Sequence, residues 1–341
     1  MEPIKVAVIG YGFAGRCFHS YLVGLVPQFT LHGIASRDPQ TRERIVAERQ
    51  CRAYTDLDEV LADSEVELVV LATPSSVHCA QSVACLEAGK HVVTDKIMCL
   101  TLNQCEQMVA AAEASGKLLT VFQNRRFDGD YLTVKHLRES GELGTVRWME
   151  LAWQGFGAWG SWRGVKAMGG GRFYDLGAHL VDQVLTLFGE PVESVYCRMR
   201  HDYESSDIDS ECLIVLTFPS GATGICDLSG TSAIVKPRWR VQGSKGTYLK
   251  YGLDPQEKAM IAGEIDAAVE PEETYGKLHD GKAERIVPTL PGRWRNYYEN
   301  VAAHLQTGTP LAVPLAQSHA ALRVFDAAVR SAETGEVVRL G

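Results

Sequence analysis

Three polar residues, Lys96, Asp175 and His179, have the types and spacing that acid–base chemistry at a hydroxyl group requires. Asp175 and His179 are four positions apart at the predicted start of a helix, so their side chains should share one helical face. A histidine is suited to act as a general base near neutral pH, and a nearby carboxylate can orient it or bind substrate. Lys96 can hydrogen-bond a hydroxyl or carbonyl oxygen. The alternative is a helix-start aspartate, a core histidine and a surface lysine without a chemical role.

The segment Gly10–Gly15 has the sequence Gly-Tyr-Gly-Phe-Ala-Gly, which fits the pattern G-x-G-x-x-G. It directly follows the first predicted strand and opens the first predicted helix, which is the context that dinucleotide binding needs. The first glycine allows a tight turn, the second lets the backbone approach a pyrophosphate, and the third lets the helix pack close to the strand. The sequence therefore predicts a dinucleotide site here. A glycine-rich turn without a ligand is the alternative.

The end of the second predicted strand, at Ser36, Arg37 and Asp38, bears on the choice of cofactor. A cofactor with a free ribose 2′-hydroxyl usually meets an acidic residue at this strand end. Here a hydroxyl and a guanidinium come first, and a guanidinium can bind a 2′-phosphate through two hydrogen bonds. The sequence therefore favours NADP and leaves NAD possible. The alternative is that Arg37 is only solvated and Asp38 only caps the next helix.

The first third of the chain alternates short apolar runs with amphipathic stretches. Strands separated by helices pair in parallel, because parallel neighbours need a crossover connection. The pattern therefore predicts an α/β fold that begins with a doubly wound parallel sheet, a Rossmann domain over residues 1–123. The predicted strands are Val6–Ile9, Leu31–Ser36, Leu68–Ala72, His91–Thr94 and Leu118–Phe122, and the predicted helices are a segment from Phe13 and the ranges Pro39–Glu48, Val77–Ala88 and Leu102–Ala114.

After the first third the pattern changes to strands with few helices between them. We therefore expect a second domain over residues 124–341 whose sheet is antiparallel or mixed. Residues 252–285 are charged and weakly patterned, which predicts an exposed excursion. The predicted strands are Val146–Trp153, Val192–His201, Cys212–Phe218, Thr223–Leu228, Trp239–Gln242 and Gly246–Tyr251, and the predicted helices are Asp175–Leu187, Arg293–Gln306 and Leu315–Ala332.

The composition is that of a globular protein and excludes several classes of partner. The chain has 341 residues, of which 45% are hydrophobic and 22% charged, and its net charge is −8 without any basic run. Nucleic acid and anionic membranes are therefore poor partners. No apolar run approaches the roughly 18 residues that span a bilayer, and no signal peptide is predicted. The nine cysteines lie apart without a C-x-x-C pair, which predicts reduced thiols, no metal site and a cytoplasmic location.

These motifs together resemble the glucose–fructose oxidoreductase and inositol dehydrogenase family (Gfo/Idh/MocA) along the whole chain. A closer likeness is to the NADP-dependent scyllo-inositol dehydrogenases and their near relatives within that family. The family likeness is carried by Gly10–Gly15, Thr73-Pro74 with His78, Ala88–Val93, Lys96 and Asp175–His179. The closer likeness is carried by Asn124–Asp128, Tyr174–Gly177 with Asp182-Gln183, and Gly243–Gly246 followed by Lys250–Glu257.

The resemblance implies hydride transfer between nicotinamide and a carbinol of a sugar, cyclitol or related polyol. His179 would take the hydroxyl proton, Lys96 would hydrogen-bond the reacting oxygen, and Asp175 would bind substrate and orient His179. It also implies that residues 124–341 form a C-terminal α/β domain with an open, mostly antiparallel sheet, whose last helices can pack back on the first domain. This domain would bind substrate and form a homodimer or homotetramer through its sheet. The cofactor-binding residues expected on this basis are Gly10, Tyr11, Gly12, Phe13, Ala14, Gly15, Ser36, Arg37, Thr73, Pro74, His78, Asp95, Lys96 and Asn124. The expected substrate-binding residues are Arg125, Trp153, Phe156, Trp159, Trp162, Arg163, Asp175 and His179.

The chain departs from the family at two places. The family's lysine is usually followed by proline, whereas this chain has Ile97, and a cis bond before a residue other than proline is rare. We therefore expect a trans bond before Ile97. Close relatives also have arginines in the segment that aligns with residues 154–159, where this chain has glycines and aromatic residues. A pocket built of Trp153, Phe156, Trp159 and Trp162 would stack on sugar faces.

Three functions remain open at this stage. The first is a reversible dehydrogenase for a sugar, cyclitol or related polyol. The second is a glycoside-cleaving enzyme that keeps its NAD(P) bound and acts by transient oxidation and elimination without net redox change. The third is a cofactor-binding sensor without catalysis. Net reduction of the cofactor by a polyol separates the first from the others, and release of an aglycone identifies the second.

Overall fold

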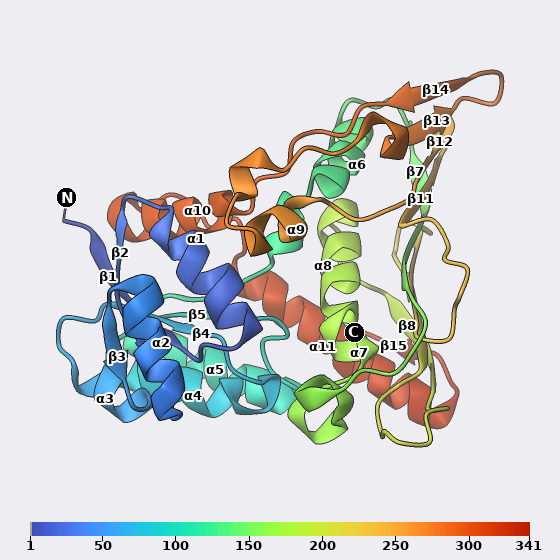
Figure 1. Ribbon diagram of the computed structural model, residues 1–341. Helices are drawn as coiled ribbons and strands as arrows, with labels where there is room; N and C mark the ends of the chain where they lie inside the picture. Colours follow the sequence, from blue (N-terminus) through green and yellow to red (C-terminus); the bar gives the residue numbers. More distant parts are fainter. Residues whose placement is uncertain (1) are drawn as a thin grey trace. The chain divides into compact units, whose positions relative to one another are not determined.

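Two different strand patterns produce two separate sheets in the computed structural model, which describes residues 2–341. Unit 1 consists of the chain up to Asn124 together with Met260–Gly263 and Trp294–His319, and it contains the first sheet (Figure 1). Unit 2 consists of Arg125–Ala259, Glu264–Arg293 and Ala320–Gly341, and it contains the second.

The sheet of unit 1 has six strands in the order β3-β2-β1-β4-β5-β6, all parallel. Val8 at its centre lies between Ile34 and Val70. The strand order reverses between β1 and β4, and in doubly wound folds the crevice at such a reversal holds the ligand. The Rossmann prediction is therefore confirmed. The strands are β1 (Ile4–Ile9), β2 (Phe29–Ala35), β3 (Arg52–Tyr54), β4 (Leu68–Leu71), β5 (His91–Thr94) and β6 (Leu119–Val121).

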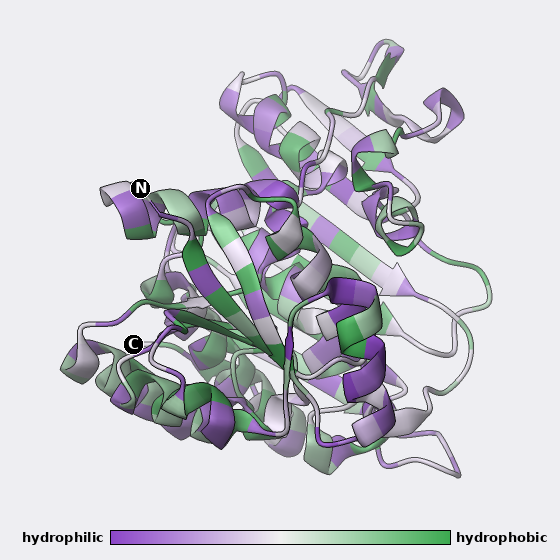
Figure 2. Cartoon of the chain, turned by 60° about the vertical axis from the view of Figure 1, so that its left-hand side comes forward, coloured by the Kyte–Doolittle hydropathy of each residue, from purple (hydrophilic) through white to green (hydrophobic). Residues whose placement is uncertain are grey.

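Helices join these strands, and their ends follow local capping rules. Asp38 accepts a hydrogen bond from the Thr41 amide at the start of α2, and Thr101 caps α5 in the same way. The helices of the first 124 residues are α1 (Ser20–Gly24), α2 (Pro39–Arg49), α3 (Leu57–Ala62), α4 (His78–Glu87) and α5 (Leu102–Ser115). Figure 2 shows apolar central strands flanked by helices with hydrophilic outer faces.

The first helix differs from the prediction of a regular helix beginning at Phe13. The chain forms a π-helical turn over Ala14–His19 and becomes α-helical only at Ser20. Such turns carry one more residue per turn than an α-helix and are frequent at functional sites. His19, the last residue of the turn, is fully buried.

Unit 2 contains a nine-stranded sheet in the order β14-β13-β12-β11-β7-β10-β9-β8-β15. The pair β7–β10 is parallel, and the other pairs are antiparallel, which confirms the prediction of a mostly antiparallel sheet. The strands are β7 (Val146–Gln154), β8 (Ser194–Arg200), β9 (Glu211–Thr217), β10 (Thr223–Ser229), β11 (Trp239–Gly243), β12 (Gly246–Lys250), β13 (Gly276–His279), β14 (Glu284–Val287) and β15 (Val338–Arg339).

Helix α8 (Gly177–Phe188) covers one face of this sheet, where it contacts β7 and β10 (Figure 1). Nearly all of its residues are buried, so it is apolar around most of its circumference. The remaining helices of the chain are α6 (Gly129–Glu139), α7 (Arg172–Asp175), α9 (Gln256–Ile261), α10 (Arg295–Thr307) and α11 (Leu315–Thr334). No helix within residues 2–341 is both long and apolar enough to cross a membrane.

The prediction that residues 252–285 form an exposed excursion is only partly right. The segment contains α9 and β13, and it reaches into β14, so it extends the sheet. The fully buried side chain of Lys250 holds it: its ammonium contacts the Glu270 carboxylate and donates to the carbonyl oxygens of Tyr251 and Thr274. Strand β14 begins with two charged residues, Glu284 and Arg285, and three of its four residues are exposed, so its sequence lacks the alternation of apolar and polar residues by which strands are predicted.

Candidate active site

The glycine loop of unit 1 has the geometry that a dinucleotide needs. Gly10 has a φ of +96°, which side chains rarely allow. A Cβ atom on Gly15 would lie 2.0 Å from the Gly10 carbonyl oxygen, so the helix approaches the strand this closely only with glycine. A Cβ atom on Gly12 would meet nothing within 4 Å, which leaves the loop open on that side. The loop therefore fits the pyrophosphate of a dinucleotide, and the nearby Phe13 side chain is exposed.

Tyr11, which we expected at the cofactor site, directs its side chain to α2. Its ring is buried, and its hydroxyl donates to Glu48 at 2.7 Å and accepts from Arg49 at 3.2 Å. Burial and the Glu48 carboxylate raise the pKa of Tyr11, so the phenol stays protonated. The side chain therefore anchors the glycine loop to α2, and only the backbone of Tyr11 remains for a cofactor.

The end of β2 presents cationic groups to solvent. Asp38 is used as a helix cap, because its carboxylate accepts from the Thr41 amide at 2.9 Å. The Arg37 side chain is exposed. Arg42, which the sequence analysis missed, donates to the carbonyl oxygens of Ser36 at 2.8 Å and Arg37 at 3.0 Å. Two guanidiniums thus flank this strand end, and the only carboxylate in the turn is already occupied.

The turn that carries Lys96 is held by two side chains of unit 1. The Asp95 carboxylate accepts a hydrogen bond from the Lys96 amide at 2.7 Å. The imidazole of His78 lies 2.9 Å from the Ile97 carbonyl oxygen and 2.8 Å from that of Thr73. His78 is buried, so this residue, expected at the cofactor site, joins the Lys96 turn to the loop after β4.

The prediction of a trans bond before Ile97 is wrong, because the Lys96–Ile97 peptide bond is cis. The prediction relied on the local preference of the peptide unit alone. In the fold, the Ile97 side chain is buried and its carbonyl oxygen contacts His78, and these tertiary contacts lay outside that argument.

His19 is a residue of this region that the sequence analysis missed. Its Nε2 atom lies 3.3 Å from a carboxylate oxygen of Asp95, and its Nδ1 atom lies 2.7 Å from the Tyr298 hydroxyl. The only signal for His19 in the sequence was its position one helical turn beyond the glycine motif. Helical periodicity by itself would assign a histidine at that position to the core. Two other residues expected to bind cofactor differ in exposure: Asn124 is buried, whereas Thr73 is half-exposed.

In unit 2, Asp175 and His179 lie on consecutive helices rather than on one. Asp175 ends α7, and His179 lies in the first turn of α8. Leu176 between them keeps right-handed helical dihedral angles, so the spacing of the two residues remains nearly helical. Arg163 donates to the Asp175 carboxylate at 3.0 Å, so two of the expected substrate-binding residues form an ion pair.

The His179 imidazole stacks on the Trp153 indole, with ring centroids 5.9 Å apart and an angle of 27° between the planes. The guanidiniums of Arg125 and Arg238 lie 4.9 and 5.2 Å from the same indole. Arg238 is buried, and it donates to Gln183 at 2.6 Å. Burial lowers the pKa of Arg238, and the nearby Asp130 carboxylate opposes that effect. Trp153 is thus fixed between His179 and two cations.

The four aromatic residues predicted to form one pocket have different partners. Trp153 stacks on His179, Trp162 lies 4.7 Å from the Arg163 guanidinium, and Trp159 lies 4.5 Å from that of Arg172. Phe156 is 78% exposed and pairs through its backbone with Thr231. Trp153 and, through Arg163, Trp162 are therefore connected to the Asp175–His179 site, whereas Phe156 faces solvent.

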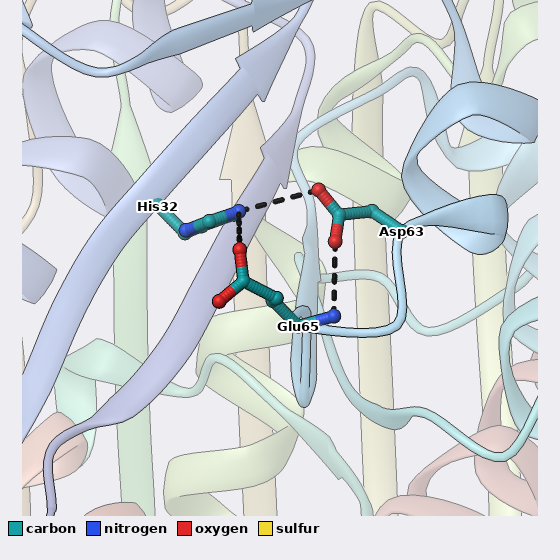
Figure 3. A group of neighbouring side chains, drawn as sticks. All are labelled: His32, Asp63 and Glu65. Carbon is teal, nitrogen blue, oxygen red and sulfur yellow. Dashed lines mark hydrogen bonds and ion pairs between the residues drawn. The ribbon is translucent and has the colours of Figure 1, made fainter.

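A further cluster of titratable side chains, His32, Asp63 and Glu65, lies within unit 1 (Figure 3). His32 contacts Asp63 at 3.3 Å, but the carboxylates have other partners: Arg52 donates to Asp63 at 2.8 Å, and Lys5 binds Glu65. The Tyr54 hydroxyl and the Glu65 amide hold the pKa of Asp63 down at about 2, which His32 reinforces. Protein cations already neutralise this cluster, so it is an ion-pair network.

Comparison with known proteins agrees with this geometry. Residues 4–123 match the model of the oxidoreductase family with an NAD-binding Rossmann fold, and residues 131–249 match the GFO/IDH/MocA C-terminal domain. The NADP-dependent scyllo-inositol 2-dehydrogenase IolW of Bacillus subtilis is 31% identical over 100% of this chain and 97% of its own. The myo-inositol 2-dehydrogenase of Thermotoga maritima is 28% identical over 71% of this chain and 74% of its own.

The structure of the Bacillus subtilis protein yvaA superimposes with a TM-score of 0.93 at 29% identity, covering 100% of this chain and 99% of that one. A fold match of this kind extends over both sheets, and the two family models match one unit each. The chain therefore belongs to the Gfo/Idh/MocA family of oxidoreductases and carries its NAD-binding Rossmann domain.

Proposed function

We propose that this protein is an NADP-dependent dehydrogenase that transfers a hydride between nicotinamide and a carbinol of a sugar, cyclitol or related polyol. The observation that carries the proposal is that one chain contains both an open glycine loop, in unit 1, and a polar Asp175–His179 site, in unit 2. Likeness to two inositol dehydrogenases supports the substrate class. Residues 1–123 bind the dinucleotide in this proposal, and residues 124–341 bind substrate and form a homodimer or homotetramer.

The preference for NADP is supported by the cations at the end of β2. A carboxylate that binds the ribose 2′-hydroxyl is the feature expected for NAD, but Asp38 already caps α2. Arg37 is exposed and Arg42 lies against the same turn, so a 2′-phosphate would find a guanidinium within reach. The Ser36 hydroxyl offers a further hydrogen bond.

The residues of this chain divide the work of moving a proton and orienting the substrate. A bound nicotinamide supplies the hydride acceptor or donor. His179 accepts the proton of the carbinol hydroxyl, and its stacking on Trp153 fixes the plane of the imidazole. Lys96 hydrogen-bonds the same oxygen, and Asp175 binds a neighbouring hydroxyl while Arg163 holds its carboxylate.

The proposal is tested by incubating the purified protein with NADP⁺ or NAD⁺ and a panel of inositols, aldoses and alditols, and by following absorbance of the reduced cofactor. We expect net reduction with at least one polyol and a higher kcat/KM with NADP⁺. Each polyol is also tested with the Lys96→Met variant, which controls for contaminating dehydrogenases.

The same experiment separates the remaining functions. Release of an aglycone from aryl glycosides with catalytic amounts of cofactor, and no net reduction with any polyol, would identify a glycoside-cleaving enzyme. Binding of NADPH without turnover of either substrate set would identify a sensor. Either result contradicts the dehydrogenase proposal.

A further inference from the structure

A buried chain of polar side chains lies behind the Lys96 turn, within unit 1. It runs from the Tyr298 hydroxyl to His19 Nδ1 at 2.7 Å, and from His19 Nε2 to a carboxylate oxygen of Asp95 at 3.3 Å. The other Asp95 oxygen accepts the Lys96 amide at 2.7 Å. Both oxygens of Asp95 are therefore used, one by the histidine and one by the backbone of the lysine.

His19 is enclosed in the interior of unit 1. It comes from the π-helical turn after the glycine loop, and its side chain is fully buried against Phe122, whose ring centroid is 4.6 Å away. The Tyr298 side chain, from α10, is also fully buried. Buried polar groups are costly unless they have partners, so an apolar residue would be the simpler choice at position 19. A histidine here indicates that its contact with Asp95 is useful.

We propose that His19 is a positioning residue for Lys96, which it serves by holding Asp95 as an ionised carboxylate in a fixed orientation. The inference rests on the catalytic role proposed for Lys96. A carboxylate fixed at both oxygens holds the backbone of the lysine, and so it sets where the side chain that carries the ammonium begins. Precise placement of such a donor matters, because a displacement of about 1 Å can lower a rate by about 10²-fold.

The charges around Asp95 agree with this assignment. The titratable groups that face it are His19, Lys96, His78 and Tyr298. Burial is the largest single influence on the pKa of the Asp95 carboxyl and raises it, but the contact with His19 and the charges of Lys96 and His78 together outweigh burial, so the pKa is lowered. Burial raises the pKa of Tyr298 far above its ordinary value, so this residue remains a neutral hydroxyl.

The predicted consequence of losing His19 is a buried carboxylate without its main partner. Asp95 would then take up a proton more readily, or its side chain would turn toward the Lys96 ammonium. Either change releases the Lys96 amide or draws the ammonium away from the reacting oxygen. His19→Leu removes both contacts, whereas His19→Gln keeps an N–H donor of similar reach that cannot titrate.

The first measurement is made on the protein without cofactor or substrate, by carbon-13 NMR of labelled aspartate carboxyl groups, with Asp95→Asn to assign the signal. We expect His19→Leu to raise the titration midpoint of Asp95 by roughly 1–3 pH units, the size of the effect of a neighbouring opposite charge, and His19→Gln to raise it less. An unchanged midpoint in both variants, with circular dichroism showing native folding, overturns the proposal.

The second measurement is kinetic. We expect kcat of His19→Leu to fall roughly 10- to 100-fold with unchanged affinity for NADPH, and His19→Gln to recover most of the loss. A shifted Asp95 midpoint with wild-type kcat overturns the positioning role, and a loss of NADPH affinity equal to the loss in kcat would place Asp95 at the cofactor. If the wild-type protein turns over no polyol, the proposed function is contradicted. The titration midpoint of the Asp95 carboxyl group in the His19 variants then still decides whether His19 holds Asp95 as a carboxylate.

Matched controls are available in the same unit. His32 and Asp63 form a second histidine–aspartate contact at the same distance, 3.3 Å (Figure 3). His32→Gln should leave kcat and the Asp95 midpoint unchanged. Tyr297→Phe is a second control, since Tyr297 is also buried on α10 but its hydroxyl reaches toward Thr120. If the control variants shift Asp95 as much as the test variants, the effect is not specific to His19 and the proposal fails.

Discussion

Replacing Arg37 by aspartate should convert the preference for NADP into one for NAD. The wild-type guanidinium can give a 2′-phosphate charge-assisted hydrogen bonds, which contribute roughly 1.5–3 kcal/mol each. Because the Arg37 side chain is exposed, a water-like dielectric constant applies to the new carboxylate. At about 5 Å, repulsion from a phosphate with two charges then adds about 1.5–2 kcal/mol.

The two contributions together give about 3–5 kcal/mol, so Arg37→Asp should weaken NADPH binding by roughly 10²- to 4 × 10³-fold. NADH lacks the 2′-phosphate, and its affinity should change little or improve slightly. Dissociation constants for both cofactors are measured by titration calorimetry at low and high salt. The NADPH effect should shrink at high salt, because the groups involved are exposed.

The control for this prediction is Arg330→Asp, which changes the net charge equally at a side chain that is 55% exposed on α11. It should leave both dissociation constants unchanged. Equal losses of NADPH and NADH affinity in Arg37→Asp, or an equal effect in the control, would show that Arg37 does not bind the 2′-phosphate and would refute the assignment made from the end of β2.

Three further predictions concern catalysis and stability. His179→Ala should lower kcat by roughly 10²-fold or more without loss of cofactor binding, and Lys96→Met should also cripple turnover; near wild-type rates in both variants would place the chemistry elsewhere. Lys250→Met should lower the free energy of unfolding by about 3–5 kcal/mol in chemical denaturation, because it leaves the Glu270 carboxylate buried, and Glu270→Gln should restore part of the loss. Asp63 has a folded-state pKa of about 2, below the unfolded value of 3.8, so its contribution to stability is present above pH 4 and is lost as pH falls toward 2; Asp63→Asn should therefore destabilise at neutral pH and not at pH 2.

The sequence predicted the parts of the fold that depend on local pattern. Apolar runs between amphipathic helices defined five of the six strands of the Rossmann sheet. The short strand β3 and helix α3 were missed, because Arg52–Tyr54 carries no apolar run and pairs only through its backbone with β2. Strand β14 was missed for the same reason. It is held by backbone pairing with β13, and its own residues show no alternation of apolar and polar side chains.

The candidate functional residues also divide into those that a local sequence pattern predicts and those that only the fold reveals. Gly10, Gly12 and Gly15 could be recognised because a loop of fixed length demands glycine at fixed positions, and the structure provides the close contacts behind that demand. His19 and Arg42 could not, because each acts on a partner that only the fold brings near: Asp95 lies 76 positions further along the chain from His19, and Arg42 turns back to the end of β2. A sequence motif with fixed spacing identifies ligand-binding residues that lie within one segment. The residues that orient them come from distant segments and are found only from three-dimensional contacts. The Lys96 turn shows the difference most clearly: its lysine was evident from the sequence, whereas the contacts of Asp95 and His78 with the backbone of the turn were not.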